Sequence, residues 1–519
     1  MTVAAIVAIV ALALSACSRN TATATAPANF AGGAVADEPQ AARVGHAILE
    51  SGGSAADAAA AMYFALAVTL PNSAGLGGGG MCVVYDPVVN RTEALDFAAR
   101  APEDGGAIAL PLNARGMFAL QAKYGRLRWP QIVAPAESMA RDGAPVSRAL
   151  ARELAALPAA TFQDPGLRRL LTRADGSLLE EGDRLIQSEL AATLAALRLR
   201  GPGDLHGGSL GARFIETTAP IGGRVDIEDL RDATPDWRAS ITLRWGDLAL
   251  HFAPPPATSG LLEAQLWRAL EPRWRRAPED ERAHMFAAAS LRAMAARDRW
   301  QRPDLTVAGA IGELVSERRA ETMMADYDPG RRAAPAAVRA NLPLPPGRSP
   351  STSFVVADGA GGAVACAVSL HKPFGAGRLL PGLGFVPASS PDADGIGPQV
   401  LAPVVGVRGT AGQFVFAASS SGGEAAAGAL VQTMLRAMVD TRPLEEALAA
   451  PRVHYSGIPD VALVERADGG LVPRGYRIET APALGRVNAI HCPDGLTVAP
   501  GRCSFRADRR GFGYAAGNL

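Results

Sequence analysis

Two hydroxyl residues, Ser351 and Thr352, stand at the start of an apolar run that is typical of a buried strand, residues 351–358. An aliphatic hydroxyl is a weak nucleophile unless a neighbouring base removes its proton. A cut in the chain just before the hydroxyl residue would supply that base, because the new α-amine has an ordinary pKa of about 8. We therefore expect the chain to cleave itself here, so that Ser351 or Thr352 becomes the nucleophile of an acyl-transfer reaction.

A second chemical signal is the sequence Ser420-Ser421-Gly422-Gly423, which lies between a predicted strand and a predicted helix. Backbone N–H groups at the start of a helix are free to donate hydrogen bonds, and the helix dipole there favours negative charge. Glycine lets a substrate carbonyl approach these groups closely. The segment predicts an oxyanion hole at Gly422 and Gly423, worth about 3–4 kcal/mol per donor, with Ser421 beside the substrate. The alternative is an ordinary tight turn between a strand and a helix.

Apolar periodicity and turn residues predict the elements that must position these groups. Ser54 and Asp57 have the spacing of a capping box, and the residues after them predict a helix to about Leu70. Further helices are expected at about 130–155, 186–200, 280–298, from 261 onward, and at 424–439. Strands are expected at 81–85, 93–97, 249–252, 354–357, 363–370, 384–386, 404–407 and 413–418. Residues 326–350 are rich in Pro, Arg and Ala and predict an exposed connector. This order favours layered α+β packing.

Gly75, Gly77 and Gly80 match a G-x-G-x-x-G pattern, which in other proteins binds dinucleotides. That pattern should follow a strand and open a helix, whereas here a predicted helix comes first and a predicted strand follows. We therefore reject a nucleotide site. The glycines are expected to permit close backbone packing or a positive φ.

The N-terminus predicts export. Residues 2–16 are almost wholly apolar but too short to span a bilayer comfortably, and they end in Leu14-Ser15-Ala16-Cys17. This ending is typical of a bacterial lipoprotein signal, so residues 1–17 are expected to form the signal, with Cys17 lipidated. The alternative is an ordinary cleaved signal peptide. Residues 18–33 predict a flexible tether, and the protein is expected on the periplasmic face of a bacterial membrane.

Composition and cysteine spacing exclude several classes of function. The chain has 51 basic and 51 acidic residues, so it carries no electrostatic footprint for nucleic acid. No spacing predicts a metal site, and nothing calls for an organic cofactor. Cys492 and Cys503 flank a Pro-Asp-Gly turn, and either a hairpin disulfide or two reduced thiols fits that spacing. Cys82 and Cys366 lie in apolar strand-like runs and are expected to be inert core residues.

Together these blocks resemble the γ-glutamyltranspeptidase (glutathione hydrolase) family of N-terminal-nucleophile hydrolases, over nearly the whole mature chain. The resemblance rests on short motifs that occur in the family's order: Gly52-Gly53-Ser54-Ala55-Ala56-Asp57-Ala58, Gly77-Gly78-Gly79-Gly80, Lys123-Tyr124-Gly125, Ala140-Arg141-Asp142-Gly143, Asp229-Leu230, Pro254-Pro255-Pro256, Ser259-Gly260, Phe374-Gly375, Gly377 and Ser421-Gly422-Gly423.

The resemblance implies a four-layer αββα sandwich made as one precursor, which cleaves into a large subunit (34–350) and a small subunit (351–519) that stay associated. The new N-terminal Thr of the family attacks a γ-glutamyl amide, and water or an amino acid takes the acyl group. Alignment on Asp358 places Ser351 at the nucleophile, with Pro350–Ser351 as the bond to be cut. A slip of one residue would make Thr352 the nucleophile and reverse the faces of the strand. We favour Ser351.

The substrate-binding positions depart from the family. The arginine that binds the glutamyl α-carboxylate falls on Ala98, and Arg100 would point to the same side if this segment were extended. The family's asparagine near the nucleophile falls on His371, which is either a replacement polar group or an exposed turn residue. The family's remaining polar positions are only partly filled: its aspartate falls on Ala393, between Asp392 and Asp394, and its paired serines fall on Ala402 and Pro403.

Each lost charged contact should cost about 1.5–3 kcal/mol of recognition. Three functions remain compatible with this pattern. The first is an exported amidase or acyltransferase that acts on a small amide, such as a γ-glutamyl compound, with a shifted substrate. The second is a catalytically inactive member kept as an exported binding or structural lipoprotein. The third is a faithful glutathione hydrolase with rearranged contacts.

Overall fold

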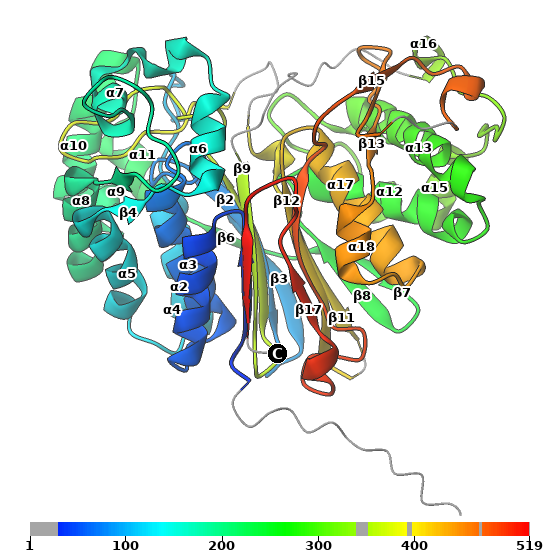
Figure 1. Cartoon of the computed structure of the whole chain (residues 1–519), viewed down its shortest axis with the longest axis horizontal. Coiled ribbons are helices and arrows are strands. Elements are labelled where there is room, and N and C mark those ends of the chain that lie inside the picture. The colour runs from blue at the N-terminus through cyan, green and yellow to red at the C-terminus, as the bar shows by residue number, and fades with distance from the viewer. Residues whose placement is uncertain (1–29, 339–350, 392–396, 410, 467–469, 518–519) are drawn as a thin grey trace, which may run out of the picture.

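The computed structural model describes residues 30–338, 351–391, 397–409, 411–466 and 470–517. Two β-sheets stand face to face in the middle of the molecule, and helices cover the outer face of each sheet (Figure 1). The four-layer αββα sandwich predicted from the sequence is therefore confirmed.

The first sheet has seven strands in the order β18-β1-β9-β10-β2-β3-β6, all pairs antiparallel. Its strands are β18 (Tyr514–Gly517), β1 (Gly32–Ala36), β9 (Ser351–Asp358), β10 (Ala363–Ser369), β2 (Gly79–Asp86), β3 (Arg91–Phe97) and β6 (Asp236–Arg238). The second sheet has six strands in the order β17-β16-β12-β11-β8-β7. They are β17 (Ser504–Arg506), β16 (Arg486–His491), β12 (Gln413–Ser421), β11 (Ala402–Arg408), β8 (Leu248–Phe252) and β7 (Ile241–Trp245).

The helices fall into two groups, one on each outer face (Figure 1). Those over the first sheet are α2 (Pro39–Glu50), α3 (Ala55–Thr69), α4 (Asn113–Tyr124), α5 (Trp129–Asp142), α6 (Arg148–Ala155), α7 (Pro165–Leu171), α8 (Ser188–Arg200), α9 (Asp204–Gly207), α10 (Ser209–Thr218) and α11 (Ile227–Asp232). Those over the second are α12 (Ser259–Trp274), α13 (Glu279–Trp300), α14 (Ile311–Leu314), α15 (Glu317–Met323), α16 (Pro335–Val338), α17 (Ala425–Met434) and α18 (Leu444–Ala449). Short pairings add β4 (Ala144–Pro145), β5 (Arg184–Leu185), β13 (Val453–His454), β14 (Ala462–Val464) and β15 (Ile478–Thr480).

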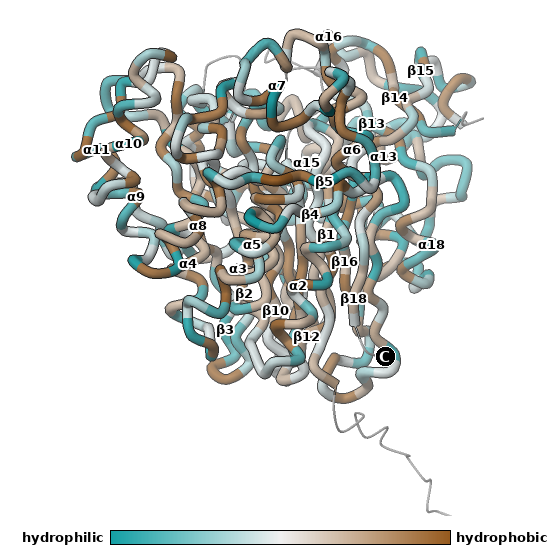
Figure 2. Tube along the Cα trace, turned by 60° about the vertical axis from the view of Figure 1, so that its left-hand side comes forward, coloured by the Kyte–Doolittle hydropathy of each residue, from teal (hydrophilic) through white to brown (hydrophobic). Residues whose placement is uncertain are grey.

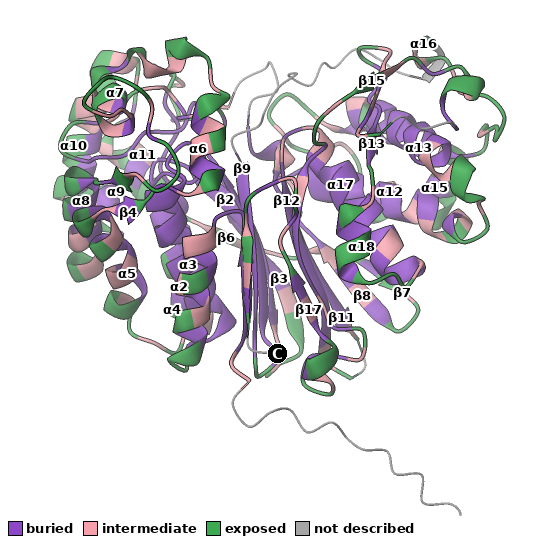
Figure 3. Cartoon of the chain, in the orientation of Figure 1, coloured by how far each residue is buried: buried purple, intermediate pink, exposed green. Residues whose placement is uncertain are grey.

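Strand alternation divides the first sheet between two cores. Phe354 and Val356 of β9 pack with the helices, whereas Val355 and Ala357 pack against the second sheet. A strand that is buried on both faces reads as a continuous apolar run, which is what the sequence shows after Ser353. Figure 3 shows this burial along both sheets, and Figure 2 shows apolar residues along the strands and inner helices.

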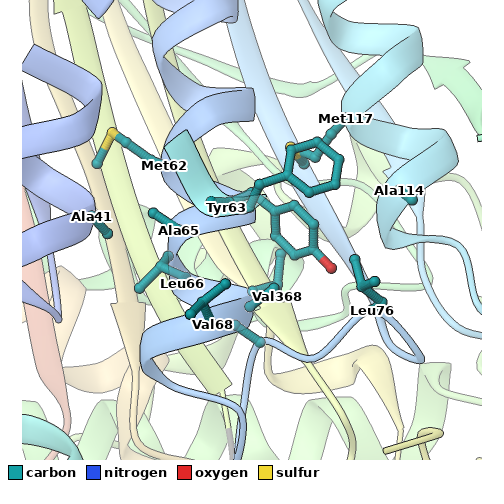
Figure 4. Close-up of a cluster of buried hydrophobic side chains, with 14 of the residues drawn as sticks. Ala41, Met62, Tyr63, Ala65, Leu66, Val68, Leu76, Ala114, Met117 and Val368 are labelled. Carbon is teal, nitrogen blue, oxygen red and sulfur yellow. The ribbon is translucent and has the colours of Figure 1, made fainter. Parts of the chain in front are cut away.

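Helix α3 is buried along its whole length and anchors the first sheet. Its predicted capping box is present: Asp57 Oδ2 accepts the Ser54 N–H at 3.0 Å, and Ser54 Oγ accepts the Asp57 N–H at 3.2 Å. Tyr63 of α3 packs beside Met117 of α4 and Val368 of β10 (Figure 4). The small residues of this helix let it lie close to the sheet that carries β9.

The predicted glycine-rich turn between α3 and β2 is confirmed as a close-packing device. A Cβ on Gly77 would lie 2.4 Å from the Val386 carbonyl oxygen, and one on Gly79 would lie 2.0 Å from the Ala99 nitrogen. Neither glycine has a positive φ, so close backbone approach explains them.

Three expected elements differ from the structure. Residues 384–386 are irregular instead of a strand, because Gly384 adopts a positive φ, and the nearest pairings are isolated bridges at Pro387 and Ser389. The predicted helix at 130–155 is two helices, α5 and α6, separated at Gly143, which also has a positive φ. Strand β1 begins at Gly32, so the end of the predicted tether is part of the first sheet.

Cys17 and the predicted signal lie outside the described residues. In the described part of the chain, none of the helices is both long enough and apolar enough to span a bilayer.

The regions before and after position 351 do not form separate units. Each sheet takes strands from both regions: β9 and β10 lie between β1 and β2 in the first sheet, and β11 pairs with β8 in the second. The two proposed subunits therefore share both sheets and the core between them.

Candidate active site

The expected nucleophiles lie at the first positions of β9, where the sandwich ends. Ser351 pairs with Ser369 on β10, and Ser353 donates a hydrogen bond to the Ser419 carbonyl of the second sheet at 3.1 Å. The side chains of residues 351 and 353 share a face, so Ser351 also faces the second sheet. Its side chain is buried, and its hydroxyl oxygen has no hydrogen-bond partner among the described residues.

Thr352 differs from Ser351 in the hydrogen bonding of its hydroxyl and in the face of the strand on which it lies. Its hydroxyl donates to Asp37 Oδ2 at 3.1 Å, and its partner across the strand pair, Val368, belongs to the core under the helices. A hydroxyl that already donates to a carboxylate is held in place, whereas that of Ser351 is left for another group. The geometry therefore favours Ser351 over Thr352 as the reacting residue.

Asp37, which the sequence interpretation missed, ties the start of β9 to the second sheet. It follows β1 directly and is buried. Its Oδ2 accepts the Ser353 N–H at 3.0 Å and the Ser421 hydroxyl at 2.9 Å, and its Oδ1 accepts the Asn488 side-chain N–H at 2.9 Å. Since a buried carboxylate needs such donors, Asp37 fixes three segments relative to one another.

Arg486 on β16 is the positive group of the site. Its guanidinium donates to the Ser351 carbonyl at 3.4 Å and to the Ser421 hydroxyl at 3.2 Å, and it bonds Glu153 of α6 at 2.7 Å. Burial opposes the charge, but the carboxylates of Asp37 and Glu153 together raise the pKa of Arg486 above its usual value. Arg486 therefore stays charged and holds Ser421 beside Ser351.

The segment predicted to form an oxyanion hole is a glycine turn between a strand and a helix. Strand β12 ends at Ser421, helix α17 begins at Ala425, and Gly422 and Gly423 have φ angles of 108° and 74°. These angles are in the region that favours glycine. Since Arg486 contacts both Ser421 and Ser351, the turn lies next to the candidate nucleophile.

Arg100 does not reach back toward Ser351. Strand β3 ends at Phe97, and Arg100 instead forms an ion pair with Asp96 at 3.5 Å, while Arg238 pairs with the same carboxylate at 3.1 Å. Burial raises the pKa of Asp96, against the opposing effects of the Ala98 N–H and the two arginines. Ala98 and Arg100 both line one cavity, in keeping with the expectation that they point to the same side, and the guanidinium of Arg100 is engaged by Asp96.

His371 lies at the same end of the sheet and is buried, so the alternative of an exposed turn histidine is wrong. Its backbone N–H donates to Ser369 Oγ at 2.8 Å, and its Nδ1 lies 2.8 Å from the Ser389 carbonyl. Because a carbonyl only accepts, Nδ1 carries the proton in this contact. His371 thus fastens the segment that follows β10 to residue 389.

The remaining expected site positions are apolar or outside the described residues. Ala402 and Pro403 pair with Ser420 and Ser419 across β11 and β12 and offer no hydroxyl. Asp392 and Asp394 fall outside the described residues. Among those that are described, no cluster of three or more His, Cys, Asp or Glu side chains could hold a metal ion.

Both cysteine pairs of the two sheets are disulfides. Cys492 and Cys503 are joined across the end of β16 and the start of β17, as one of the two sequence alternatives predicted. Cys82 and Cys366 are also joined, with Cα atoms 4.1 Å apart. These two cysteines are core residues as expected, but they are bonded to each other instead of free, because β2 and β10 pair in the register that places them opposite each other.

Comparisons with known proteins agree with this geometry. Residues 41–390 match the family model described as Gamma-glutamyltranspeptidase. The chain is 25% identical over 512 residues to the glutathione hydrolase proenzyme of Escherichia coli (strain K12), covering 87% of each chain. It is 29% identical over 525 residues to the acylase ACY 1 proenzyme of Pseudomonas sp. (strain V22), covering 91% of this chain and 92% of that one.

The fold is likewise similar to a solved structure, that of the cephalosporin acylase from Bacillus halodurans. The two superpose with a TM-score of 0.77 at 20% identity, covering 94% of this chain and 96% of the other. The family match spans most of the sequence, and the fold, the strand-initial hydroxyl and the glycine turn accompany it. The chain therefore belongs to the gamma-glutamyltranspeptidase family of N-terminal-nucleophile hydrolases.

Proposed function

We propose that this chain is the precursor of an amidase or acyltransferase that cuts its own Pro350–Ser351 bond and then uses the Ser351 hydroxyl as nucleophile. The observation that carries the proposal is the buried Ser351 hydroxyl, which has no hydrogen-bond partner in the described part of the chain and lies at the start of a central strand beside a glycine turn. The family's proenzyme relatives support the same course.

Self-cleavage needs no group beyond this chain and water. Ser351 Oγ attacks the Pro350 carbonyl, the peptide C–N bond breaks, and the nitrogen takes the hydroxyl proton. The resulting ester is hydrolysed by water, which leaves a carboxylate on Pro350 and a free α-amine on Ser351. Arg486, bonded to the Ser351 carbonyl, holds the residue in position during this exchange.

Amide hydrolysis then repeats the same chemistry on a substrate. The α-amine takes the Ser351 proton as Oγ attacks the amide carbon. The developing oxyanion is stabilised by N–H groups of the Gly422–Gly423 turn, and the amine leaves with the proton. Water, or the amino group of an acceptor, then removes the acyl group from Ser351.

The substrate should not be a simple glutamyl amide. The positions that bind the glutamyl group in the family that the chain resembles are Ala98, Ala402 and Pro403 here. Arg100 forms an ion pair with Asp96. The acylase relative is also more similar to the chain than the bacterial glutathione hydrolase named above, at 29% against 25% identity.

The loss of these polar substrate-binding positions also favours a second candidate function. In this alternative the chain is an inactive family member that serves as an exported binding or structural lipoprotein.

We also propose that the protein is exported and anchored through a lipid on Cys17. The signal-like residues 1–17 support this placement, as do the two disulfides, which persist in oxidising compartments. Metabolic labelling with palmitate should mark the wild type and not Cys17→Ser, and an unlabelled wild type would contradict the anchor.

The test of the central proposal is a reducing denaturing gel with N-terminal analysis of the smaller band. Wild type should give two bands, the smaller beginning at Ser351, and Ser351→Ala should stay whole. The matched control is Thr352→Val, which removes the neighbouring hydroxyl at similar volume and should still be cut. An uncut wild type would support the inactive alternative, and loss of cutting in Thr352→Val alone would make Thr352 the nucleophile.

A further inference from the structure

A large cavity opens at the end of the sandwich that carries Ser351. Its volume is about 990 Å³, and its apolar lining includes Ala98, Ala101, Pro254, Leu305, Val307 and Ile311. Sites for small molecules usually fall within roughly 300–1,000 Å³. A cavity of this size is large for a glutamyl group.

Strand register places the cavity at the same end of the sandwich as the candidate nucleophile. Ser351 lies opposite Ser369, Ser369 opposite Gly79, and Gly79 beside Ala98, so Ala98 is three strands away, roughly 14 Å. In the second sheet Ser420 lies opposite Ala402, and Pro254 continues β8 alongside Ala402, roughly 10 Å from Ser420. Each wall of the cavity thus continues a row of residues that are paired across neighbouring strands, and each row begins at the candidate active site.

The charges of the cavity are balanced. Its two cationic side chains, Arg100 and Arg238, both pair with the buried Asp96, and Arg238 also pairs with Asp236. Asp304, also on the wall, adds another negative charge. Among the residues that the structure describes, the lining therefore offers no surplus of positive charge for a carboxylate, and apolar burial is what it can supply.

We propose that this cavity binds the acyl part of the substrate, and that this part is a neutral, mainly apolar chain longer than a glutamyl group. The inference rests on the proposed function, since Ser351 would attack the carbonyl of that acyl group. The leaving amine would lie on the other side of Ser351, away from Ala98.

The test compares p-nitroanilides that differ only in the acyl group. Wild type should hydrolyse the octanoyl compound with a kcat/KM about tenfold or more above the γ-glutamyl and acetyl compounds. Ala101→Trp adds bulk at an exposed position of the cavity wall and should lower kcat/KM for the octanoyl compound about tenfold, through KM, and by more than for the acetyl compound. Ala174→Trp, exposed and away from the cavity, is the matched control.

A binding measurement keeps the cavity testable without turnover. Calorimetry with 1-octanol, which cannot be hydrolysed, should show binding to wild type and Ala174→Trp and weaker binding to Ala101→Trp. Preference for the γ-glutamyl compound, or no effect of Ala101→Trp, would overturn the cavity inference while leaving a Ser351-dependent amidase in place. Failure of the chain to cut itself or to hydrolyse any amide would overturn the proposed function. The octanol measurement would still show whether the cavity binds an apolar chain.

A second inference follows independently from the disulfides. Cys82 lies on β2, before the proposed cut, and Cys366 lies on β10, after it. Cys492 and Cys503 both lie after the cut. We infer that the two subunits of the mature protein remain covalently joined through Cys82–Cys366, which also rests on the proposed self-cleavage.

Denaturing gels with and without dithiothreitol test this link. Wild type should run as one band near the intact mass without reductant and as two bands with it. Cys366→Ser should give two bands in both conditions, whereas the matched control Cys503→Ser should behave as wild type. Two wild-type bands without reductant would overturn the link alone, and one band with reductant would overturn self-cleavage. Mass spectrometry of unreduced peptides should find 82 joined to 366 even if Cys366→Ser fails to fold.

Discussion

At the scale of single residues, the site depends on one buried carboxylate. Asp37 accepts hydrogen bonds from Thr352, Ser353, Ser421 and Asn488, and it lies near the charged Arg486. Without it, the Thr352 hydroxyl, the Ser353 N–H and the Ser421 hydroxyl would lose this acceptor in a buried place, whereas Asn488 also donates to Ser353. Asp37 is therefore a positioning residue for Ser351, since it touches the neighbours of the nucleophile and not the nucleophile itself.

We predict that Asp37→Asn folds with reduced stability and cuts itself slowly. The amide keeps one acceptor oxygen but removes the charge that balances Arg486, which should lower the free energy of unfolding by about 3 kcal/mol. A small displacement of Ser351 should slow self-cleavage about a hundredfold. Gel time courses and urea denaturation measure the two effects. Cleavage at the wild-type rate would show that Asp37 does not position the nucleophile.

At the scale of elements, close backbone contacts hold β3 and the cavity wall against β2. Gly79 pairs beside Ala98, and a Cβ there would collide with the Ala99 nitrogen and the Phe97 carbonyl. The collision partners are backbone atoms, which cannot turn aside as a side chain can. Glycine at this position is thus required by strand spacing.

We predict that Gly79→Ala lowers the free energy of unfolding by about 1–3 kcal/mol, because β2 and β3 must move apart to make room for the added Cβ. Gly203→Ala is the matched control, since a Cβ there meets nothing within 4 Å and needs no positive φ. Urea midpoints compare the two variants with wild type. Equal destabilisation by both would contradict the role of close packing at Gly79.

At the scale of the whole molecule, local patterns predicted the layers but not the contacts between them. The apolar run after Ser353, the Ser54–Asp57 capping box and the glycine turn at 422–423 all follow from short-range signals, and the structure has each of them. Asp37 was missed because its partners are 315 to 451 residues away along the chain. The Cys82–Cys366 bond was missed for the same reason, at a separation of 284.

A local signal could still have shown that residues 37–39 are structured. Glu38 caps α2 by accepting the Ala41 N–H at 2.9 Å, and Pro39 occupies the first turn, which is a common start of a helix. That signal places an ordered acidic pair beside β1 but does not reveal that Asp37 reaches β9, β12 and β16. The roles of Arg486 and Asn488 depend likewise on sheet pairing and not on neighbouring sequence.

The measurement that tests the central claim most directly is the N-terminal sequence of the small fragment released under reducing, denaturing conditions. We predict a fragment that begins Ser-Thr-Ser-Phe from wild type and Thr352→Val, and no fragment from Ser351→Ala. A wild-type chain that stays whole, or a fragment that still forms in Ser351→Ala, would contradict the account.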